Sequence, residues 1–218
     1  MKELFVRHKK TLIISTLLCL LPILFGVIMW DRLPDPMPTH FGVNGEPDGW
    51  SSKPFAVFFL PAFLAAMEWV CLLASSADPR RKNLSPKVLT LVLYIVPIVG
   101  LVACGATYAA ALNMNFNISL IMSALVGVMF IVIGNYLPKC RQTYTLGIKL
   151  PWTLANEENW NKTHRMAGPL WMIGGAAQIV LAFCSGEIAF YGMLILVVTI
   201  TLVPTAYSFL LAKKQGQI

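Results

Sequence analysis

The sequence predicts an all-α integral membrane protein with six transmembrane helices and both termini in the cytoplasm. Its 218 residues are 57% hydrophobic and 12% charged, whereas about a quarter of the residues in a water-soluble domain are charged. Six apolar stretches are each long enough for a helix to cross a bilayer, which takes about 20 residues. These stretches do not alternate apolar and polar residues, so a membrane-spanning β-barrel is excluded.

The six predicted spans lie between polar segments. They are residues 11–30, 55–77, 88–112, 119–137, 166–184 and 188–212. The first stretch is too long for the apolar part of a signal peptide, and no Ala-x-Ala cleavage site follows it before Trp30. We therefore expect a membrane anchor that the protein retains.

The distribution of basic residues predicts the orientation. Fifteen of the seventeen Lys and Arg residues lie at the N-terminus, in the second-to-third loop, in the fourth-to-fifth loop or in the C-terminal tail. Only Arg32 and Lys53 lie on the opposite side. Because cytoplasmic loops are enriched in Lys and Arg, both termini should face the cytoplasm of a bacterial cell. Membrane topology thus accounts for the net charge of +7, and we expect membrane lipids as partners and no direct binding of nucleic acid.

Two polar loops divide the chain into two predicted regions. Residues 1–87 form a two-helix membrane region with an external loop, residues 31–54. Residues 88–218 form a four-helix membrane region with a cytoplasmic loop, residues 138–165. The other connections are short, so we expect function to reside in these two loops and in polar residues inside the spans.

The external loop has the composition of an ordered cap. Pro34 and Pro38 restrict the backbone and favour extended neighbours. Asn44 and Gly45 suit a tight turn, and residues 46–49 suit a second, type I turn. Stiff entry followed by two turns indicates a structured element.

The polar and aromatic residues of this loop allow two interpretations. His40, Asn44 and Asp48 could converge on a ligand, or they could satisfy the loop's own backbone, as Asn and Asp side chains often do. Phe41 and Trp50 are expected at headgroup depth, where aromatic rings are favoured. We expect no metal site, because one histidine and scattered carboxylates are too few ligands, and no cofactor.

The cytoplasmic loop contains several helix signals. Pro138 marks the end of the fourth span, and Gly147 and Pro151 interrupt the chain that follows. Trp152 and Thr153 resemble a helix entry with Thr153 as the N-cap. From the next residue, a helix could continue directly into the fifth span.

That helix would present several polar side chains. Glu158 and Lys162 have the favourable i,i+4 order, and Trp160 and His164 fall on one face. His164 could serve as a catalytic base beside an acid of the first turn, but no nucleophile or metal signature accompanies it. The alternative is that His164 and Arg165 anchor the helix at the membrane interface.

Glu68 lies near the middle of the second predicted span. A charged side chain there costs about 3 kcal/mol on insertion scales. It is either a functional intramembrane acid or a packing residue hydrogen-bonded to another span. The candidate partners are Tyr94, Tyr108, Asn135 and Gln178.

Two sets of residues resemble known families. Leu33-Pro34, Pro38, His40-Phe41, Gly45, Pro47-Asp48 and Lys53 resemble a small membrane domain of unknown function that often precedes bacterial immunity proteins of the SdpI type. The second set is similar to the signature of the SdpI family itself. It comprises Leu137-Pro138-Lys139, Gly147-Ile148, Pro151-Trp152-Thr153, Trp160, Thr163-His164-Arg165 and Gly168.

The chain departs from the family pattern at three positions. Thr143 stands where the family commonly has asparagine, and Lys149 and Leu150 stand where Arg-Thr is common. Lysine keeps the positive charge but lacks the planar guanidinium group. Any bidentate contact that the family makes there is therefore not expected here.

The resemblance implies a non-enzymatic immunity protein that protects a bacterium against a secreted, membrane-active peptide toxin. For the type member, it also implies capture of a cytoplasmic autorepressor. The implied toxin-facing residues are Pro34, Pro38, His40, Phe41, Asn44, Gly45, Asp48 and Trp50. The implied partner-facing residues are Pro138, Arg141, Gly147, Lys149, Pro151, Trp152, Thr153, Glu158, Trp160, His164 and Arg165. The alternatives are a small transporter or channel that uses Glu68 and kinked helices, and an intramembrane enzyme acting through His164.

Overall fold

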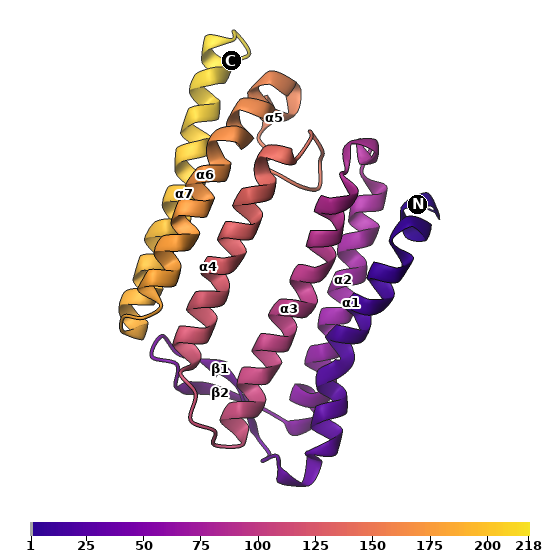
Figure 1. The fold of residues 1–218 in the computed structure, drawn as a ribbon, viewed down its shortest axis with the longest axis vertical. Helices are drawn as coiled ribbons and strands as arrows, with labels where there is room; N and C mark the ends of the chain where they lie inside the picture. The colour runs from indigo at the N-terminus through magenta and orange to yellow at the C-terminus, as the bar shows by residue number, and fades with distance from the viewer. Residues whose placement is uncertain (1) are drawn as a thin grey trace. The chain divides into compact units, whose positions relative to one another are not determined.

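The structure, a computed structural model, describes residues 2–218, with side chains from residue 5 onward. The described residues are mainly helical, with one short β-hairpin (Figure 1). The helices are α1 (Lys2–Ile28), α2 (Leu60–Ala77), α3 (Pro86–Ala111), α4 (Ile118–Tyr136), α5 (Pro151–Ala155), α6 (Glu157–Leu181) and α7 (Gly186–Lys214). The strands are β1 (Met37–Phe41) and β2 (Pro47–Ser51).

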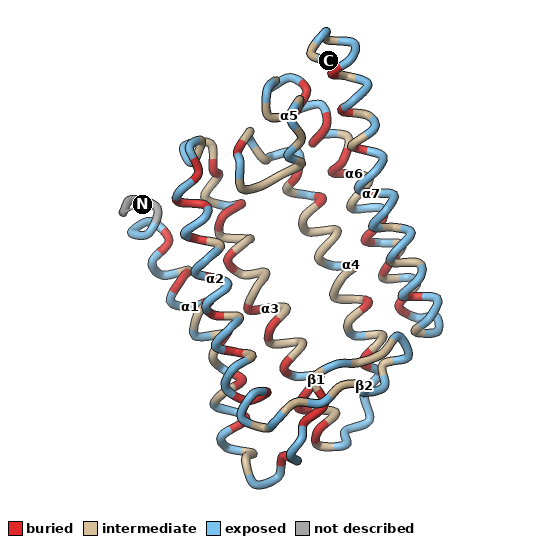
Figure 2. Tube along the Cα trace, turned by 180° about the vertical axis from the view of Figure 1, so that it is seen from behind, coloured by how far each residue is buried: buried red, intermediate tan, exposed pale blue. Residues whose placement is uncertain are grey.

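Five helical segments in the described residues are long and apolar enough to cross a membrane. They are Phe5–Ile28, Phe55–Ala77, Pro86–Ala111, Ile118–Lys139 and Gly186–Lys214. Much of the surface of the long helices is exposed (Figure 2), and that surface is apolar, as hydrocarbon requires. The prediction of an all-α membrane protein is confirmed.

The predicted fifth span, residues 166–184, falls largely on α6. This helix is not among the five, and its first nine residues, 157–165, are polar apart from Trp160. Its apolar part begins only at Met166. The number of crossings, and with it the location of the two termini, stays a prediction.

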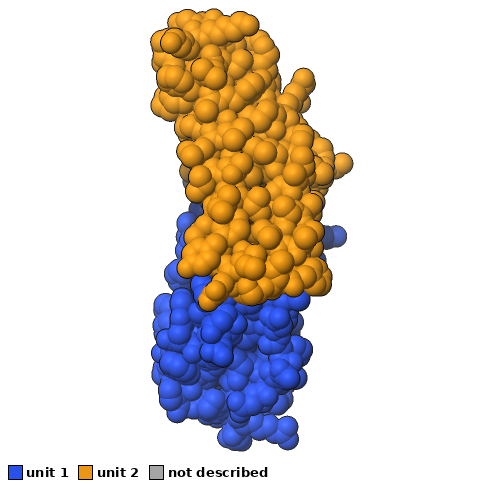
Figure 3. Space-filling view, turned by 90° about the vertical axis from the view of Figure 1, so that its left-hand side faces the viewer, with its two compact units in different colours: residues 1–73, 90–122 blue, residues 74–89, 123–218 orange. Residues whose placement is uncertain are grey.

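The chain divides into two compact units (Figure 3). Unit 1 contains Met1–Leu73 and Thr90–Met122, and unit 2 contains Ala74–Leu89 and Ser123–Ile218. The division into regions 1–87 and 88–218 rests on sequence motifs and stays a prediction.

The core of unit 1 lies where α1, α3 and the start of the second span meet the root of the hairpin. Tyr108 of α3 donates its hydroxyl hydrogen to the carbonyl oxygen of Pro22 in α1, at 2.8 Å. Gly26 leaves the space that this contact needs, because a Cβ there would lie 2.6 Å from the Tyr108 hydroxyl oxygen. The buried members of this core are Leu33, Met37, Ala56, Val57, Cys104, Tyr108 and Ala111.

In unit 2, α4 and α6 cross closely at two glycine pairs. A Cβ on Gly127 would lie 2.7 Å from the carbonyl oxygen of Gly175, and a Cβ on Gly134 would lie 2.7 Å from that of Gly168. The two pairs lie seven residues apart on each helix and in opposite order, so the helices run antiparallel and approach closely at both glycine pairs. Such seams drive helix association in membranes, where lipid is as apolar as the side chains.

This seam predicts that Gly175→Leu destabilises the protein by about 1–3 kcal/mol, because the new side chain must push α4 away from α6. Thermal unfolding of the detergent-solubilised protein measures the effect. Gly105→Leu is the matched control, since a Cβ on Gly105 of α3 meets nothing within 4 Å. Equal melting temperatures for both variants would contradict the packing described here.

Candidate functional site

The loop of residues 31–54 contains an antiparallel hairpin. Met37 pairs with Ser51 and Phe41 pairs with Pro47, with irregular register between these ends. The side chains of Thr39 and Ser51 share a hydrogen bond of 2.9 Å across the two strands. The expectation of an ordered element is confirmed.

One turn closes this hairpin. Gly45 has a φ of +81°, which favours glycine, and the N–H of Gly42 donates to the carbonyl oxygen of Glu46 at 2.9 Å. The predicted second turn at residues 46–49 is wrong, because Pro47–Ser51 is strand β2. Once Gly42 and Glu46 pair, the chain has already reversed, and the following residues extend back along β1.

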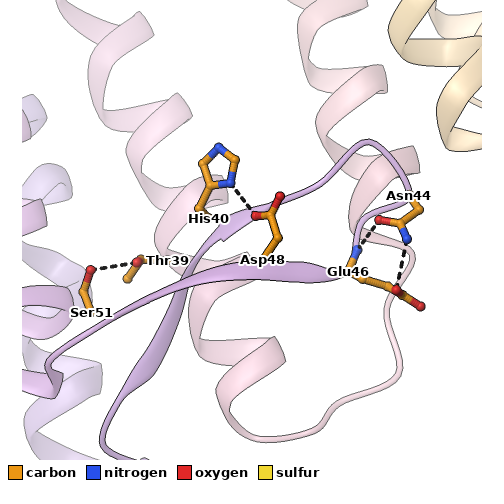
Figure 4. Close-up of polar contacts among 6 residues, drawn as sticks. All are labelled: Thr39, His40, Asn44, Glu46, Asp48 and Ser51. Atoms are coloured by element: carbon orange, nitrogen blue, oxygen red, sulfur yellow. Dashed lines mark hydrogen bonds and ion pairs between the residues drawn. The ribbon is translucent and has the colours of Figure 1, made fainter.

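The polar side chains of the hairpin contact one another (Figure 4). His40 and Asp48 form an exposed ion pair across the strands, with Nδ1 and Oδ1 2.5 Å apart. Asn44 instead bridges the turn: its Oδ1 accepts from the N–H of Glu46 and its Nδ2 donates to the Glu46 carboxylate. His40 and Asp48 therefore come together, but Asn44 does not join them. The contacts fit the interpretation in which these side chains satisfy the loop itself.

The hairpin is tied down at its root and open at its tip. Pro38 is buried, whereas Pro34 is exposed and Phe41 is half-buried. The ammonium group of Lys53 donates a hydrogen bond of 3.1 Å to the carbonyl oxygen of Trp30, and it lies over the Trp30 ring. Trp50 is 57% exposed on β2, so a large aromatic surface is available to a ligand.

Glu68 is fully buried in unit 1, and its partners differ from those predicted. Its carboxylate accepts hydrogen bonds from the hydroxyls of Ser15 and Thr16 and from the thiol of Cys19, all on α1. The prediction of Tyr94, Tyr108, Asn135 or Gln178 as partners is therefore wrong. The i,i+4 spacing of Ser15 and Cys19 places both on the face of α1 that meets α2.

In unit 2, Trp160 and His164 form the centre of the polar segment of residues 138–165. The two rings are stacked with centroids 4.1 Å apart, and both side chains are buried. Trp160 donates its indole N–H to the carbonyl oxygen of Cys140 at 2.8 Å. Burial raises the pKa of the Cys140 thiol to about 11, so this cysteine stays a neutral thiol.

Both ring nitrogens of His164 are engaged. Nε2 accepts the N–H of Ile148 at 2.9 Å, and Nδ1 lies 2.8 Å from the carbonyl oxygen of Trp160, which requires the hydrogen on Nδ1. Burial lowers the pKa of His164, in keeping with this neutral form. The interfacial-anchor interpretation is wrong for His164, because the side chain is 1% exposed and organises the loop.

Gly147 allows the loop to approach this pair. Its φ is +108°, and a Cβ there would lie 2.6 Å from Nε2 of His164 and 2.7 Å from the Trp160 ring. Any side chain would therefore strain the backbone and collide with two buried rings. This explains why position 147, in the Gly147-Ile148 motif, is a glycine.

The helix entry differs from the prediction. Pro151–Ala155 forms the separate helix α5, and Asn156, with extended backbone angles, caps α6 by accepting the N–H of Asn159 at 3.0 Å. Thr153 is therefore not the N-cap of the long helix. Instead, it lies buried within α5, where its hydroxyl accepts the N–H of Leu150 and donates to the carbonyl oxygen of Ile148.

Trp152 ties α5 to the end of α7. Its indole N–H donates to the hydroxyl of Ser208 at 2.9 Å, and its ring meets Phe209 edge to face. Asn159 of α6 donates to the carbonyl oxygen of the same Ser208 at 3.0 Å. Pro151, at the first position of α5, remains exposed.

The remaining sequence-predicted residues of this segment lie at the surface. Pro138, Arg141, Lys149 and Arg165 are exposed. Glu158 and Lys162 form the expected i,i+4 pair at 2.6 Å, which lowers the pKa of Glu158 and raises that of Lys162 through their hydrogen bond.

Of the three departures from the family pattern, Thr143 is buried and bonds within the loop. Its hydroxyl donates to the carbonyl oxygen of Leu146 and accepts that residue's N–H. Lys149 donates to the carbonyl oxygen of Thr145 with its single ammonium group.

Sequence reasoning missed Asp78, which directly follows α2 and is 2% exposed. Its Oδ2 accepts the backbone N–H groups of Tyr144 and Thr145, each at 2.9 Å, and the Thr145 hydroxyl at 2.8 Å. The sequence did offer a signal, because Asp78 is the one acidic residue in the basic loop between the second and third predicted spans. That loop was considered only for its Lys and Arg residues, which predict orientation.

No group of three or more His, Cys, Asp or Glu side chains that could hold a metal ion occurs among the described residues. The exposed residues of the two polar segments, Trp50 on the hairpin and Tyr144 in the loop, suit recognition of another molecule.

The fold and these contacts define a multi-span α-helical membrane protein with two structured polar segments. Within that class, residues 139–208 match the SdpI/YfhL protein family, and residues 17–65 match a domain of unknown function, DUF1648. The immunity protein SdpI of Bacillus subtilis (strain 168) is 27% identical over 207 residues, covering 93% of this chain and 96% of that protein. No solved structure matches the chain. The resemblance predicted from the two motifs is confirmed.

The geometry at Gly147 predicts that Gly147→Ala loosens the cytoplasmic loop and lowers the melting temperature. Gly216→Ala is the matched control: Gly216 also has a positive φ, +67°, but a Cβ there meets nothing within 4 Å. Both variants place a Cβ at a positive φ, and only Gly147→Ala also collides with His164 and the Trp160 ring. A Gly147→Ala protein as stable as the Gly216→Ala protein would rule out the close approach.

The neutral His164 predicts that stability falls as the pH is lowered from 8 to 5. The unfolded imidazole takes up a proton near pH 6.5, whereas the folded one does so only at lower pH, so the unfolded state binds more protons in between. Melting temperatures across this range measure the effect. His164→Gln should weaken the dependence on pH, and an unchanged slope in this variant would refute the assignment.

Proposed function

We propose that this chain is a multi-pass immunity protein that protects a bacterium against a secreted, membrane-active peptide toxin. The observation that carries the proposal is the similarity to immunity protein SdpI of Bacillus subtilis, which extends over nearly the full length of both chains. It therefore includes both structured polar segments, the hairpin and the cytoplasmic loop. The proposed mechanism is binding, without a catalytic step.

The hairpin is the proposed toxin-facing surface. It is rigid, because one turn and several side-chain bonds fix it, and it exposes Trp50 beside the acidic residues Glu46 and Asp48. A preorganised aromatic surface suits recognition of an amphipathic peptide at the membrane interface, since little conformational freedom is lost on binding.

The second part of the proposal concerns orientation and signalling. Six crossings, with α6 as the fifth, place both termini and the loop of residues 138–165 in the cytoplasm, as the basic residues require. There the exposed surface of the loop would capture a cytoplasmic repressor once toxin is bound. Support comes from the exposed Arg141 and Lys149 on a loop whose buried side is fixed by Trp160 and His164.

Complementation tests the proposal. A Bacillus subtilis strain 168 derivative that lacks SdpI is made to produce this chain and is grown with its parent. We expect the producing cells to survive as well as cells given back SdpI, and a strain with the empty vector to be killed. Failure to protect, both here and in the chain's own host after deletion of its gene, would contradict the proposed function.

Trp50→Ala should reduce this protection while leaving the amount of protein in the membrane unchanged, because the side chain is exposed and supports no core. Tyr144→Ala is the matched control, since Tyr144 is an aromatic residue of the cytoplasmic loop with 47% exposure. Equal survival of the two variants would remove the hairpin from toxin recognition.

Glu68→Gln distinguishes immunity from transport. The contacts with Ser15, Thr16 and Cys19 favour a packing role, and glutamine can still accept hydrogen bonds from the hydroxyls on α1. We therefore expect protection to be retained. Loss of protection at an undiminished membrane level would favour a transporter or channel that uses this acid.

A further inference from the structure

The end of α2 is fastened to the cytoplasmic loop by one carboxylate. Asp78 accepts three hydrogen bonds on Oδ2, two from the backbone N–H groups of Tyr144 and Thr145 and one from the Thr145 hydroxyl. Its Oδ1 accepts the N–H of Arg80 at 2.7 Å. Both carboxylate oxygens are thus used, and the charge is met by donors in the manner of an anion-binding turn.

Neighbouring residues strengthen this attachment. Arg80 donates to the carbonyl oxygen of Leu154 at 3.2 Å, and its guanidinium lies 4.9 Å from the centre of the Tyr144 ring. Asn83 donates to the carbonyl oxygen of Gln142 at 2.9 Å. Three side chains of one short connection therefore hold the loop from the same side, and we refer to Asp78, Arg80 and Asn83 as the clasp.

The loop depends on the clasp because it has no helix or strand of its own between residues 140 and 150. Its backbone N–H groups at positions 144 and 145 would otherwise lack a partner within the described contacts. Hydrogen bonds to a charged group are stronger than those between neutral groups. Loss of Asp78 should therefore release this part of the loop.

The clasp follows the C-terminal end of α2. The N-terminal end of α2 comes shortly after the hairpin in the sequence. Strand β2 ends at Ser51, a π-helical turn covers Phe55–Phe59, and α2 then runs uninterrupted from Leu60 to Ala77, immediately before Asp78. A shift or rotation of α2 along its axis therefore moves Asp78 directly. The covalent chain thus runs through the single helix α2 from the proposed toxin-facing hairpin to the clasp.

We propose that Asp78 is the positioning residue through which α2 controls the shape of residues 143–149. The surface that it fixes exposes Tyr144 and Lys149, next to the exposed Arg141, and this basic and aromatic character suits an acidic segment of the cytoplasmic partner. When the hairpin is occupied, movement of α2 would be transmitted through the intact clasp and would bring this surface into the shape that binds the partner. The inference rests on the proposed function, because that function gives the loop its partner.

Hydrogen–deuterium exchange on the full chain in lipid nanodiscs tests the clasp without toxin or partner. In Asp78→Asn, the amide replaces one acceptor oxygen with a donor, so peptides covering residues 141–150 should exchange about tenfold faster. Glu157→Gln is the matched control, since it removes one negative charge at an exposed site on α6. Unchanged exchange in Asp78→Asn would overturn the inference.

Two cellular measurements separate control of the loop from simple folding. Cells producing Asp78→Asn are scored for survival against toxin in culture fluid from the parent strain and for induction of a reporter gene joined to the promoter of the chain's own gene. We expect survival and membrane levels to match the unaltered chain, while toxin no longer induces the reporter. Faster exchange with full reporter induction would show a structural role only and would overturn the inference.

A second variant tests whether the effects of Asp78→Asn arise from misfolding. Asp78→Glu keeps the charge but displaces it by one methylene group, so it should exchange faster than the unaltered chain and slower than Asp78→Asn, with partial reporter induction. Asp78→Glu behaving like Asp78→Asn in survival as well as induction would overturn the inference. Were the unaltered chain to give no survival, the proposed function would fail, and the exchange measurement would still decide whether the clasp holds the loop.

Discussion

A polar group that leaves water for hydrocarbon must find its partner within the chain, and this constraint governs the structure. It selects helices, whose backbone bonds are all internal, and it accounts for the few polar side chains found inside them. Glu68 is paired with hydroxyl and thiol groups on α1, and Gln178 of α6 donates to Ser123 of α4 and to the carbonyl oxygen of Ala189 in α7. These polar contacts join helices that apolar side chains alone would not hold in register.

The same constraint shapes the polar ends, where the chain leaves its helices. Residues 140–150 lack regular secondary structure, so side chains provide the partners for their backbone: His164 for Ile148, Thr153 for Leu150 and Asp78 for Tyr144 and Thr145. The hairpin solves the problem differently, by pairing two strands and closing them with Gly45. One polar segment is thus fixed by its own backbone and the other by groups from elsewhere in its unit. The second kind is the easier to switch, because a single side chain can release it.

Local sequence patterns predicted the helices and the hairpin turn well, but they could not predict contacts between residues far apart in the sequence. Apolar stretches located the helices, and Asn44-Gly45 located the hairpin turn, because both signals act over a few neighbouring residues. The partners of Glu68 could not be predicted, since the face of α1 that meets α2 depends on packing. Thr153 was taken for a helix cap because Pro151 precedes it, whereas the structure places a short helix there and starts the long helix after Asn156. Asp78 was missed because its bonds span 66 and 67 residues.

The central claim is that the hairpin and the loop lie on opposite sides of the membrane, so that one meets toxin and the other meets a cytoplasmic partner. Labelling intact cells with a membrane-impermeant maleimide tests it most directly, in a chain whose five native cysteines are replaced by alanine. Trp50→Cys should be labelled in intact cells, and Arg141→Cys should be labelled only after the cells are permeabilised. Labelling of both positions from outside, or of neither, would contradict the claim.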